Sequence, residues 1–474
     1  MWHAARMSIP APAPRPVAVV ILAAGQGTRM KSDLHKVLHP LAGRPMLLHL
    51  LAAVDALNPA RIVVVAGARR EQVEAAVARR AMVAVQDEQR GTAHAVLAAR
   101  DALAGFDGDV LILFGDAPLV ETATMRRLLD ALTPDTGVAV LGFRPADPGA
   151  YGRIVADANG RIAKMVEFKD ASPAERAVDL CNSGVTAVRS AELWPLLARV
   201  GNANAAGEYY LPDIVALADR PGRVIETSAS EVAGVNSRAE LAAVEAAWQD
   251  SARAAMMAAG VSLVAPETVW FAYDTVVGRD VTIEPNVVFG PGVSVGDGAT
   301  IHAFCHLAGA TIGAGASVGP FARLRPGTNL GAHAKVGNFV EIKAASIGGG
   351  TKVSHLSYIG DATIGANANI GAGTITCNYD GFFKYRTTIG AGAFIGSNSA
   401  LVAPVTIGDG AIVAAGSVIT ADVEAGALAL ARGTQSSKPG WATRFTAAMR
   451  ARKTGKLYCG VIYFRNDPDS SRSA

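Results

Sequence analysis

Residues 311–343 read TIGAGASVGPFARLRPGTNLGAHAKVGNFVEIK, and the feature that stands out in this stretch is a period of six. Large apolar residues recur at six-residue intervals, at Ile312, Val318, Leu324, Leu330, Val336 and Ile342. A helix and a β-hairpin do not repeat every six residues, whereas a hexapeptide β-helix does, with one apolar side chain per short strand pointing inward. The stretch therefore predicts a parallel β-helix with three hexapeptides in each triangular coil.

The same period continues on both sides of this stretch. It is carried before it by Ile283, Phe289, Val295, Ile301 and Leu307, and later by Ile389, Ile395, Leu401, Ile407, Val413 and Ile419. Residues 283–419 thus predict roughly seven coils, each rising about 4.8 Å. The repeat is interrupted at 378–387, NYDGFFKYRT, which has aromatic and basic residues but no hexad. An insertion in a solenoid becomes a surface loop, and such loops often bind ligands.

The N-terminal half follows a different pattern. Short β-branched runs at 17–22, 61–67, 82–86 and 109–116 alternate with Ala- and Leu-rich stretches such as 45–57 and 91–103. This alternation predicts a mostly parallel sheet covered by helices on both faces. Ligands of such sheets lie beyond the carboxyl ends of the strands. The glycine-rich segment after the first strand and the FGD at 114–116 are therefore expected at one rim.

A long helix is expected between the two halves. Ser237 and Glu240 form a capping-box pattern, Leu241, Val244 and Trp248 fall on one helical face, and a glycine at 260 can end the helix. The chain then divides into a disordered leader (1–16), an α/β domain (17–235), a linker helix (236–260), a β-helix domain (261–435) and a basic tail (436–474).

Composition limits the class of protein. The 474 residues include 44 Lys and Arg against 41 Asp and Glu, and a net charge of +3 does not suggest a nucleic-acid partner. The four cysteines are scattered without CxxC spacing, which supports neither a zinc cluster nor a disulfide framework and favours a reducing cytoplasm. The chain begins without the apolar region of a signal peptide, and a membrane-spanning run is not expected.

Several motifs carry a resemblance to a known family. "LAAGQGTRM", Lys36 in "LHKVLH", "QDEQRGTAHA", "FGDAPL", "YGRIV", "VEFKD", "CNSG", "GEYYLPDI" and "GVNSR" are similar to the sugar-nucleotide pyrophosphorylases. Followed by "GPFARLRPG", "VGNFVEIK", "SHLSYIGDATIGANANIGAGTITCNYDG" and "VAPVTIG", their order resembles the bacterial bifunctional N-acetylglucosamine-1-phosphate uridylyltransferase / glucosamine-1-phosphate acetyltransferase, over about residues 17–435.

The resemblance implies a fold and a pair of activities. The fold is a Rossmann-like nucleotidyltransferase domain plus a left-handed parallel β-helix. The enzyme acetylates glucosamine-1-phosphate with acetyl-CoA and then transfers UMP from UTP to N-acetylglucosamine-1-phosphate, releasing pyrophosphate. The product, UDP-N-acetylglucosamine, supplies peptidoglycan and lipopolysaccharide synthesis.

For uridylyl transfer the resemblance assigns charge stabilisation to Arg29 and Lys36, and Mg²⁺ to Asp116 and Asn236. A carboxylate and an amide oxygen suffice for a hard cation that also bridges phosphates, and phosphoryl-type transfer needs positioning more than a protein nucleophile. Gln26 and His35 depart from the family, where many relatives carry Lys and Pro. The implied substrate contacts are Leu22, Ala23, Ala24, Gly25, Lys36, Gln86, Gly91, Thr92, Phe114, Gly115, Asp116, Gly152, Glu167, Asn182 and Asn236. Among them, the resemblance assigns uracil to Gln86, Gly91 and Thr92, and the sugar hydroxyls and acetamido group to Gly152, Glu167 and Asn182.

For acetyl transfer the resemblance implies that His355 is the base. An ammonium cannot attack a thioester until it loses a proton, and an imidazole titrates in the required range. Glu341, one coil earlier, is a candidate to orient His355. The resemblance assigns the sugar phosphate to Arg325 and Lys343, the sugar to Tyr358 and Asn369, and acetyl-CoA to Ala372, Asn378, Tyr379, Ser397, Ala415 and Arg432.

Two other interpretations stay open. In one, the β-helix only assembles or regulates a single enzyme, which leaves His355, Arg325 and Lys343 without a role. In the other, the chain is a non-enzymatic assembly factor, which has no use for a phosphate and metal set. Small-molecule substrates are expected from the resemblance. A homotrimer is also expected, because three triangular rods can pack by cyclic symmetry and the family's acetyl site lies between subunits.

The basic tail is the last feature of the sequence. Residues 436–474 hold eight Lys and Arg against two Asp. A solvated, disordered end is the simpler interpretation. The alternative is that Lys438, Arg444 or their neighbours approach the phosphates of coenzyme A, an attraction that salt would weaken.

Overall fold

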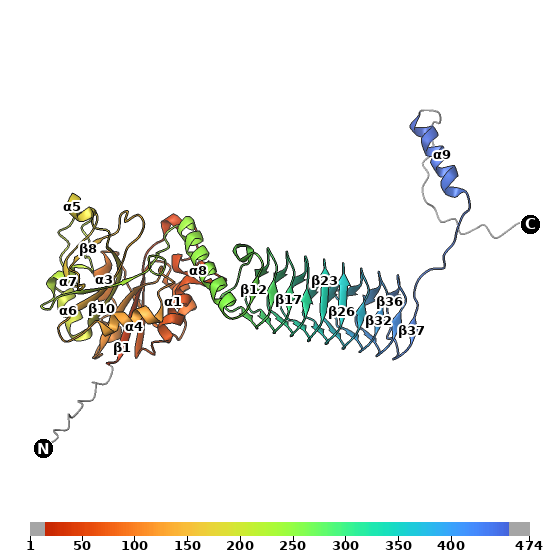
Figure 1. Cartoon of the computed structure of the whole chain (residues 1–474), viewed down its shortest axis with the longest axis horizontal. Coiled ribbons are helices and arrows are strands. Elements are labelled where there is room, and N and C mark those ends of the chain that lie inside the picture. The colour runs from red at the N-terminus through yellow and green to blue at the C-terminus, as the bar shows by residue number, and fades with distance from the viewer. Residues whose placement is uncertain (1–14, 455–474) are drawn as a thin grey trace, which may run out of the picture.

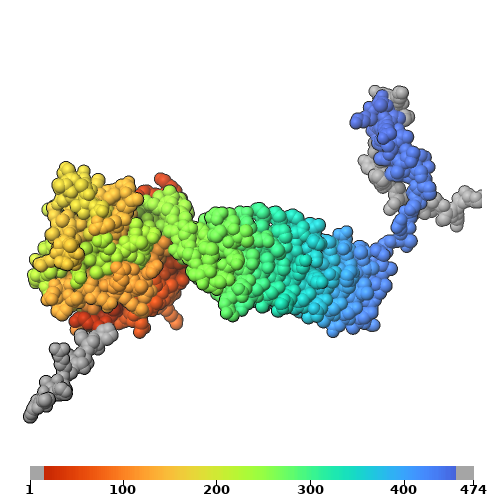
Figure 2. All heavy atoms as spheres, viewed as in Figure 1, coloured from red at the N-terminus to blue at the C-terminus, as the bar shows by residue number. Residues whose placement is uncertain are grey.

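The computed structural model describes residues 15–454, so most of the expected leader and the end of the basic tail lie outside the described residues. An N-terminal α/β domain, the long helix α8, an extended β-helix and a C-terminal helix α9 follow one another along the molecule (Figure 1). In the space-filling view the α/β domain and the β-helix form one continuous body, and α9 stands apart from it (Figure 2).

The α/β domain is built on a nine-stranded sheet with the order β11-β7-β10-β6-β1-β4-β5, from which β8 and β9 branch. Neighbours β6, β1, β4 and β5 are parallel, while β10 runs antiparallel to β6 and β7. The strands are β1 (Val17–Ala23), β4 (Arg61–Ala66), β5 (Met82–Val85), β6 (Asp109–Phe114), β7 (Val138–Phe143), β8 (Arg153–Ala156), β9 (Ile162–Val166), β10 (Cys181–Arg189) and β11 (Arg223–Thr227), with a small hairpin of β2 (Pro40–Leu41) and β3 (Arg44–Pro45).

Helices cover both faces of this sheet because its central strands are buried on both sides. In β1, Val19 and Ile21 belong to one hydrophobic cluster and Ala18, Val20 and Leu22 to the other, as the two-residue period of a strand requires. Helices α1 (Met46–Asp55), α2 (Arg70–Val77) and α4 (Thr122–Asp130) pack into the first cluster, and α3 (Thr92–Leu97), α6 (Ser190–Leu197) and α7 (Asp213–Leu217) into the second. The short helix α5 spans Pro173–Arg176.

The β-helix has three parallel sheets, named here the first, second and third faces. The first face holds β12 (Ser262–Leu263), β14 (Thr282–Ile283), β17 (Thr300–Ile301), β20 (Ser317–Val318), β23 (Lys335–Asn338), β26 (Lys352–His355), β29 (Asn369–Ile370), β32 (Phe394–Ile395), β35 (Ile412–Val413) and β37 (Leu428–Ala429). The second holds β13 (Val276–Val277), β16 (Ser294–Val295), β19 (Ala310–Ile312), β22 (Thr328–Leu330), β25 (Ser346–Ile347), β28 (Ala362–Ile364), β31 (Thr387–Ile389) and β34 (Val405–Ile407). The third holds β15 (Val288–Phe289), β18 (His306–Leu307), β21 (Arg323–Leu324), β24 (Glu341–Lys343), β27 (Tyr358–Gly360), β30 (Ile375–Cys377), β33 (Ala400–Val402) and β36 (Val418–Ile419).

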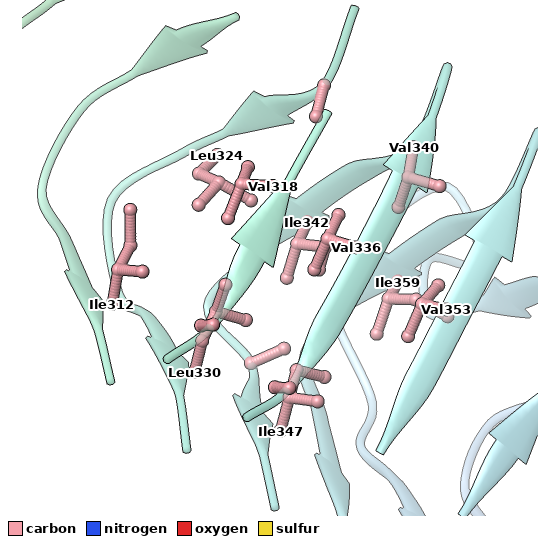
Figure 3. Close-up of a cluster of buried hydrophobic side chains, with 14 of the residues drawn as sticks. Ile312, Val318, Leu324, Leu330, Val336, Val340, Ile342, Ile347, Val353 and Ile359 are labelled. Atoms are coloured by element: carbon pink, nitrogen blue, oxygen red, sulfur yellow. The ribbon is translucent and has the colours of Figure 1, made fainter. Parts of the chain in front are cut away.

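The six-residue period is the spacing along the chain from one face to the next, and each face recurs once per coil. The residues that define it point inward and are stacked in columns, one per face, as for Val318, Val336 and Val353 (Figure 3). Each is buried, Leu330 being the most exposed of the six quoted first, at 3%. Burial of about 1.5–3 kcal/mol per large aliphatic side chain, repeated in every coil, stabilises the rod. The predicted parallel β-helix is confirmed.

Helix α8 (Arg238–Ala258) and the first coil hold the two parts together. The β2–β3 hairpin is fixed from both sides, since Ala42 accepts from the backbone N–H of Tyr273 at 2.9 Å and donates to the Glu245 carboxylate at 2.8 Å. Arg44 lies over the Tyr273 ring, 5.1 Å from its centroid. Only half of the predicted capping box forms: Ser237 accepts from the Glu240 N–H, but the Glu240 carboxylate accepts from Asn236 instead of from Ser237.

Part of the basic tail is helical, contrary to the simpler expectation of a disordered end. Helix α9 spans Trp441–Lys453 and has basic residues in its last turn. Across the part of the chain that the structure describes, no helix is both long and apolar enough to cross a membrane.

Candidate active sites

A cavity of about 320 Å³ opens at the carboxyl ends of the parallel strands of the α/β domain. Its walls come from the ends of β1 and β6, from the segment around Lys36, and from the start of α3. Gln89 and Glu208 also line it and were missed by the motif comparison, although both lie inside quoted motifs. The predicted residues that the cavity brings together are Leu22, Ala23, Ala24, Gly25, Lys36, Gln86, Gly91, Thr92, Phe114 and Asp116.

The backbone explains why these segments meet. Strands β1 and β6 are in register at Leu22 and Phe114, and the Gly115 N–H donates to the Leu22 carbonyl at 2.9 Å. The loop after β1 closes onto Lys36 through Gly27, whose φ is 63° and where a Cβ would lie 2.7 Å from the Lys36 Cβ. Glycine is required there for both reasons.

Lys36, Asp116 and Asn236 form a hydrogen-bonded cluster, of which Lys36 and Asp116 line the cavity and Asn236 lines an adjoining hollow. The Lys36 ammonium lies 2.5 Å from Asp116 Oδ2 and 2.9 Å from Asn236 Oδ1. The two oxygens are held by the backbone, because the N–H of residue 235 donates to the Asp116 carbonyl at 2.9 Å and the Glu240 carboxylate accepts from the Asn236 N–H. One carboxylate and one amide oxygen that already converge on a positive charge fit a hard divalent cation whose other ligands come from phosphates and water.

Residues 15–454 contain no group of three or more His, Cys, Asp and Glu side chains suited to a metal ion. The pair of oxygens at Asp116 and Asn236 is therefore a site that a substrate would have to complete, unlike an all-protein metal cage.

The residues expected to bind the sugar, Gly152, Glu167 and Asn182, do not line the cavity, and Glu167 lines another hollow. Gly152 and Glu167 are in contact, since a Cβ on Gly152 would lie 3.2 Å from the Glu167 carboxylate oxygens, and the Asn182 N–H donates to the Gly152 carbonyl at 2.9 Å. Burial, and then the negative charge of Asp213, raise the pKa of Glu167. A second hollow of about 270 Å³ shares Asp116 with the cavity and extends to Asn236.

Arg29 and His35, near the first site, lie in contrasting environments, one exposed and the other buried. Arg29 is exposed on the turn after the glycine loop and does not line the cavity. His35 is 3% exposed, and its two ring nitrogens have no hydrogen-bond partner within residues 15–454. Burial and then the neighbouring charge of Lys36 lower the pKa of His35. The His35 N–H donates to Gln72 at 2.8 Å, a bond that a proline could not make.

The second candidate site runs along the edge between the first and third faces of the β-helix, where equivalent residues of successive coils stack. His355 ends β26, and Ala372, Ser397 and Ala415 take the same place in the next three coils. Backbone bonds follow this edge, from Asn398 N–H to the Ala372 carbonyl at 2.7 Å and from Gly416 N–H to the Ser397 carbonyl at 2.8 Å. Arg432 closes the column by donating to the Ala415 carbonyl at 2.8 Å.

His355 has a partner that the sequence did not suggest. Its Nδ1 contacts Oδ1 of Asn338, the residue opposite it in the register of β23 and β26. Glu341, which was expected to orient His355, instead accepts from Arg325 at 2.8 Å and lies 3.7 Å from Arg323. The only signal available for Asn338 was its position one coil of 17 residues before His355, whereas Glu341 is 14 residues away and falls on the next face.

The residues expected to bind glucosamine-1-phosphate are not all on the His355 edge. Lys343 ends β24 beside the opposite edge of the third face, where Asp361 lies 3.9 Å from its ammonium. Asp361 also accepts from the Asn378 amide, so the inserted loop begins at this same edge. The ring of Tyr379 is 60% exposed on that loop, and Asn369 lies on the first face in β29. A single chain therefore spreads the predicted acetyl-transfer residues over two faces and two edges.

Comparison with known proteins agrees with both halves. The profile of the MobA-like NTP transferase domain matches residues 19–207, and that of the bacterial transferase hexapeptide (six repeats) matches 274–309 and 386–421. Among solved structures, a CMP:2-keto-3-deoxy-manno-octonic acid synthetase complexed with CTP matches with a TM-score of 0.40 and 20% identity, covering 50% of this chain and 99% of that one, too distant to bear on function.

Relatives match along nearly the whole chain. Proteins from Rhizorhabdus wittichii, Sphingopyxis alaskensis and Novosphingobium aromaticivorans are 66%, 64% and 63% identical to it. In each case the match covers 93% of this chain and 99% of the relative. All three are named bifunctional protein GlmU.

Proposed function

This chain belongs to the family of the bifunctional protein GlmU, a uridylyltransferase and acetyltransferase of UDP-N-acetylglucosamine synthesis, and from this premise we propose how its own residues carry the two activities. Uridylyl transfer is assigned to residues 17–235 and acetyl transfer to residues 261–435. Helix 236–260 joins them, and residues 436–474 form a basic tail. The observation that carries the first assignment is the convergence of the Asp116 and Asn236 oxygens on the Lys36 ammonium, which lines the strand-end cavity.

In the uridylyl site the chain's own groups position UTP and balance its charge. The loop at Gly25 offers backbone N–H groups to the phosphates, with Arg29 moving in as the opposing charge, and Gln86, Gly91 and Thr92 receive the uracil ring. Asp116 and Asn236 would hold Mg²⁺, which neutralises the phosphate oxygens when bound. The Lys36 ammonium would then leave these oxygens for the phosphates. An oxygen of the sugar-1-phosphate attacks the α-phosphorus, and the bond to pyrophosphate breaks.

The acetyl site uses the column of small residues above His355. An acetyl-CoA molecule would extend along Ala372, Ser397 and Ala415 toward Arg432, which places its thioester next to His355. The amine nitrogen of glucosamine-1-phosphate bonds to the thioester carbonyl carbon, the carbon–sulfur bond breaks, and His355 accepts the proton that the amine loses. Arg325 and Lys343 would bind the sugar phosphate.

We also propose a homotrimer, which the distribution of these groups supports. His355 lies at one edge of the third face, while Lys343 and the loop at Asn378 lie at the other. Packing three rods side by side would bring one edge against the other edge of a neighbour, completing each acetyl site between two chains. The substrates are small molecules in a cytoplasmic pathway.

Separating the two activities by single substitutions tests the assignment. Asp116→Ala removes a cation ligand and is expected to stop pyrophosphate release while thiol release continues, so that N-acetylglucosamine-1-phosphate accumulates. His355→Ala should lower thiol release by about 10²- to 10⁴-fold and leave uridylyl transfer to supplied N-acetylglucosamine-1-phosphate intact. Asp33→Ala and His306→Ala, at exposed positions, serve as matched controls. Loss of both activities in either folded variant contradicts independent sites.

A further inference from the structure

Asn338 and His355 are held together by the geometry of the β-helix. They are paired in the register of β23 and β26, and the Leu356 N–H donates to the Asn338 carbonyl at 3.1 Å. Both are followed by a residue with positive φ, Phe339 at 55° and Leu356 at 52°, so each ends its strand at the same corner. Their side chains therefore leave the backbone at equivalent positions of adjacent coils.

The contact between the two side chains has a defined direction. The amide oxygen Oδ1 of Asn338 faces Nδ1 of His355. An amide oxygen can only accept, so this contact is a hydrogen bond when Nδ1 carries the hydrogen and Nε2 keeps its lone pair. This is the tautomer that a base needs if it is to take a proton through Nε2.

We propose that Asn338 is a positioning residue for acetyl transfer, which fixes the ring orientation and the tautomer of His355 through this hydrogen bond. The inference rests on the proposed role of His355 as the base. Its substrate class is that of the acetyl site, a primary amine and a thioester.

The surroundings leave Asn338 free for this task. The residue in the same place one coil earlier is Pro320, whose side chain has no hydrogen-bonding group, and the one a coil after His355 is Ala372, which leaves room beside the ring. Glu341, the orienting group that was expected from the sequence, is engaged by Arg325 and Arg323. A neutral partner also has a chemical consequence: it orients the imidazole without adding a negative charge that would favour its protonated form.

The experiment compares Asn338→Leu and Asn338→Asp with wild type in the full-length protein. Leucine has a similar shape but no acceptor, and aspartate keeps an acceptor and adds a charge. Asn329→Leu, at an exposed position of the second face, is the control for loss of an amide. Uridylyl transfer and the oligomeric state are measured on each variant to verify that the chain is folded.

Asn338→Leu is expected to lower kcat for acetyl transfer by about 10- to 100-fold, less than the loss of the base itself, with KM for both substrates changed by no more than about twofold. Asn338→Asp should recover most of kcat and move the acidic limb of the pH profile to higher pH, by about one unit.

Two outcomes overturn the inference. One is an unchanged kcat in Asn338→Leu. The other is an equal loss in both variants without a shift of the pH profile, which would mean that the amide does not act as an acceptor. His355→Ala distinguishes failure of the proposed base from failure of the proposed positioning residue. If His355→Ala retains the acetylation rate, the assignment of His355 as the base is wrong. If His355→Ala is inactive while Asn338→Leu has a normal rate, only the role of Asn338 is rejected.

Discussion

Removing the Asp116 carboxylate should destabilise the α/β domain, because the ammonium group of Lys36 then loses its counter-charge. In the free protein the Lys36 side chain is 10% exposed and its ammonium lies 2.5 Å from Asp116, which is 20% exposed. A hydrogen bond to a charged group contributes about 1.5–3 kcal/mol, and breaking a fully buried ion pair costs about 3–5 kcal/mol. Because Asn236 still accepts from Lys36 and the site opens into the cavity, we expect Asp116→Ala to lower the free energy of unfolding by about 2 kcal/mol.

The double variant distinguishes this cause from simple loss of packing. Lys36→Met replaces the ammonium by an apolar group of similar length, so Asp116→Ala combined with Lys36→Met has no stranded charge and should regain stability to within about 1 kcal/mol of wild type. Uridylyl transfer should remain absent in the double variant, so this variant would regain stability without regaining activity.

Hydrogen exchange in increasing denaturant, followed on peptides that cover β1 and β6 without Mg²⁺ or nucleotide, measures this domain separately from the β-helix. A double variant that is no more stable than Asp116→Ala would refute the reasoning. Adding Mg²⁺ provides a second readout: it should stabilise Lys36→Met more than wild type, since the two oxygens are no longer occupied by the ammonium.

Three further outcomes are expected. His35 is buried with a pKa below its ordinary 6.5, so unfolding takes up a proton below that pH; stability should fall as the pH drops from about 6.5, and His35→Leu should reduce the fall measured by denaturation at pH 7.5 and 5.5. Truncation after Gln435 should raise KM for acetyl-CoA, less so at high salt, because it removes the basic residues of α9; an unchanged KM would reject this role. Sedimentation should find a trimer, and a monomer with full acetyl-transfer activity would contradict a site shared between chains.

The fold of each half could be predicted from the sequence because each half has its own repeating pattern of residues. Six-residue spacing fixes one inward residue per strand, so the buried columns at Val318, Val336 and Val353 could be predicted without a structure. Strand–helix alternation likewise predicted the parallel core of β5, β4, β1 and β6. The antiparallel β10 was not predicted, because alternation of elements does not give the direction of a strand that enters late between two others.

Side-chain partners were predicted less well than positions. The motif comparison brought Lys36, Asp116 and Asn236 to one site, but did not predict that the lysine bridges the two oxygens in the free protein. The group that contacts His355 depends on which other partners are available. Glu341 accepts a hydrogen bond from Arg325, and the register of the coils places Asn338 opposite His355. Such choices depend on the stacking of coils, which a linear spacing does not reveal.

One measurement tests the central claim, that this chain carries two successive activities at separate sites. Purified protein is incubated with glucosamine-1-phosphate, acetyl-CoA, UTP and Mg²⁺, and thiol, pyrophosphate and UDP-N-acetylglucosamine are followed together. The account predicts that thiol release begins first, that pyrophosphate follows after a lag while N-acetylglucosamine-1-phosphate builds up, and that omitting acetyl-CoA abolishes both. Pyrophosphate release from glucosamine-1-phosphate at full rate without acetyl-CoA, or thiol release without any nucleotide-sugar product, would contradict it.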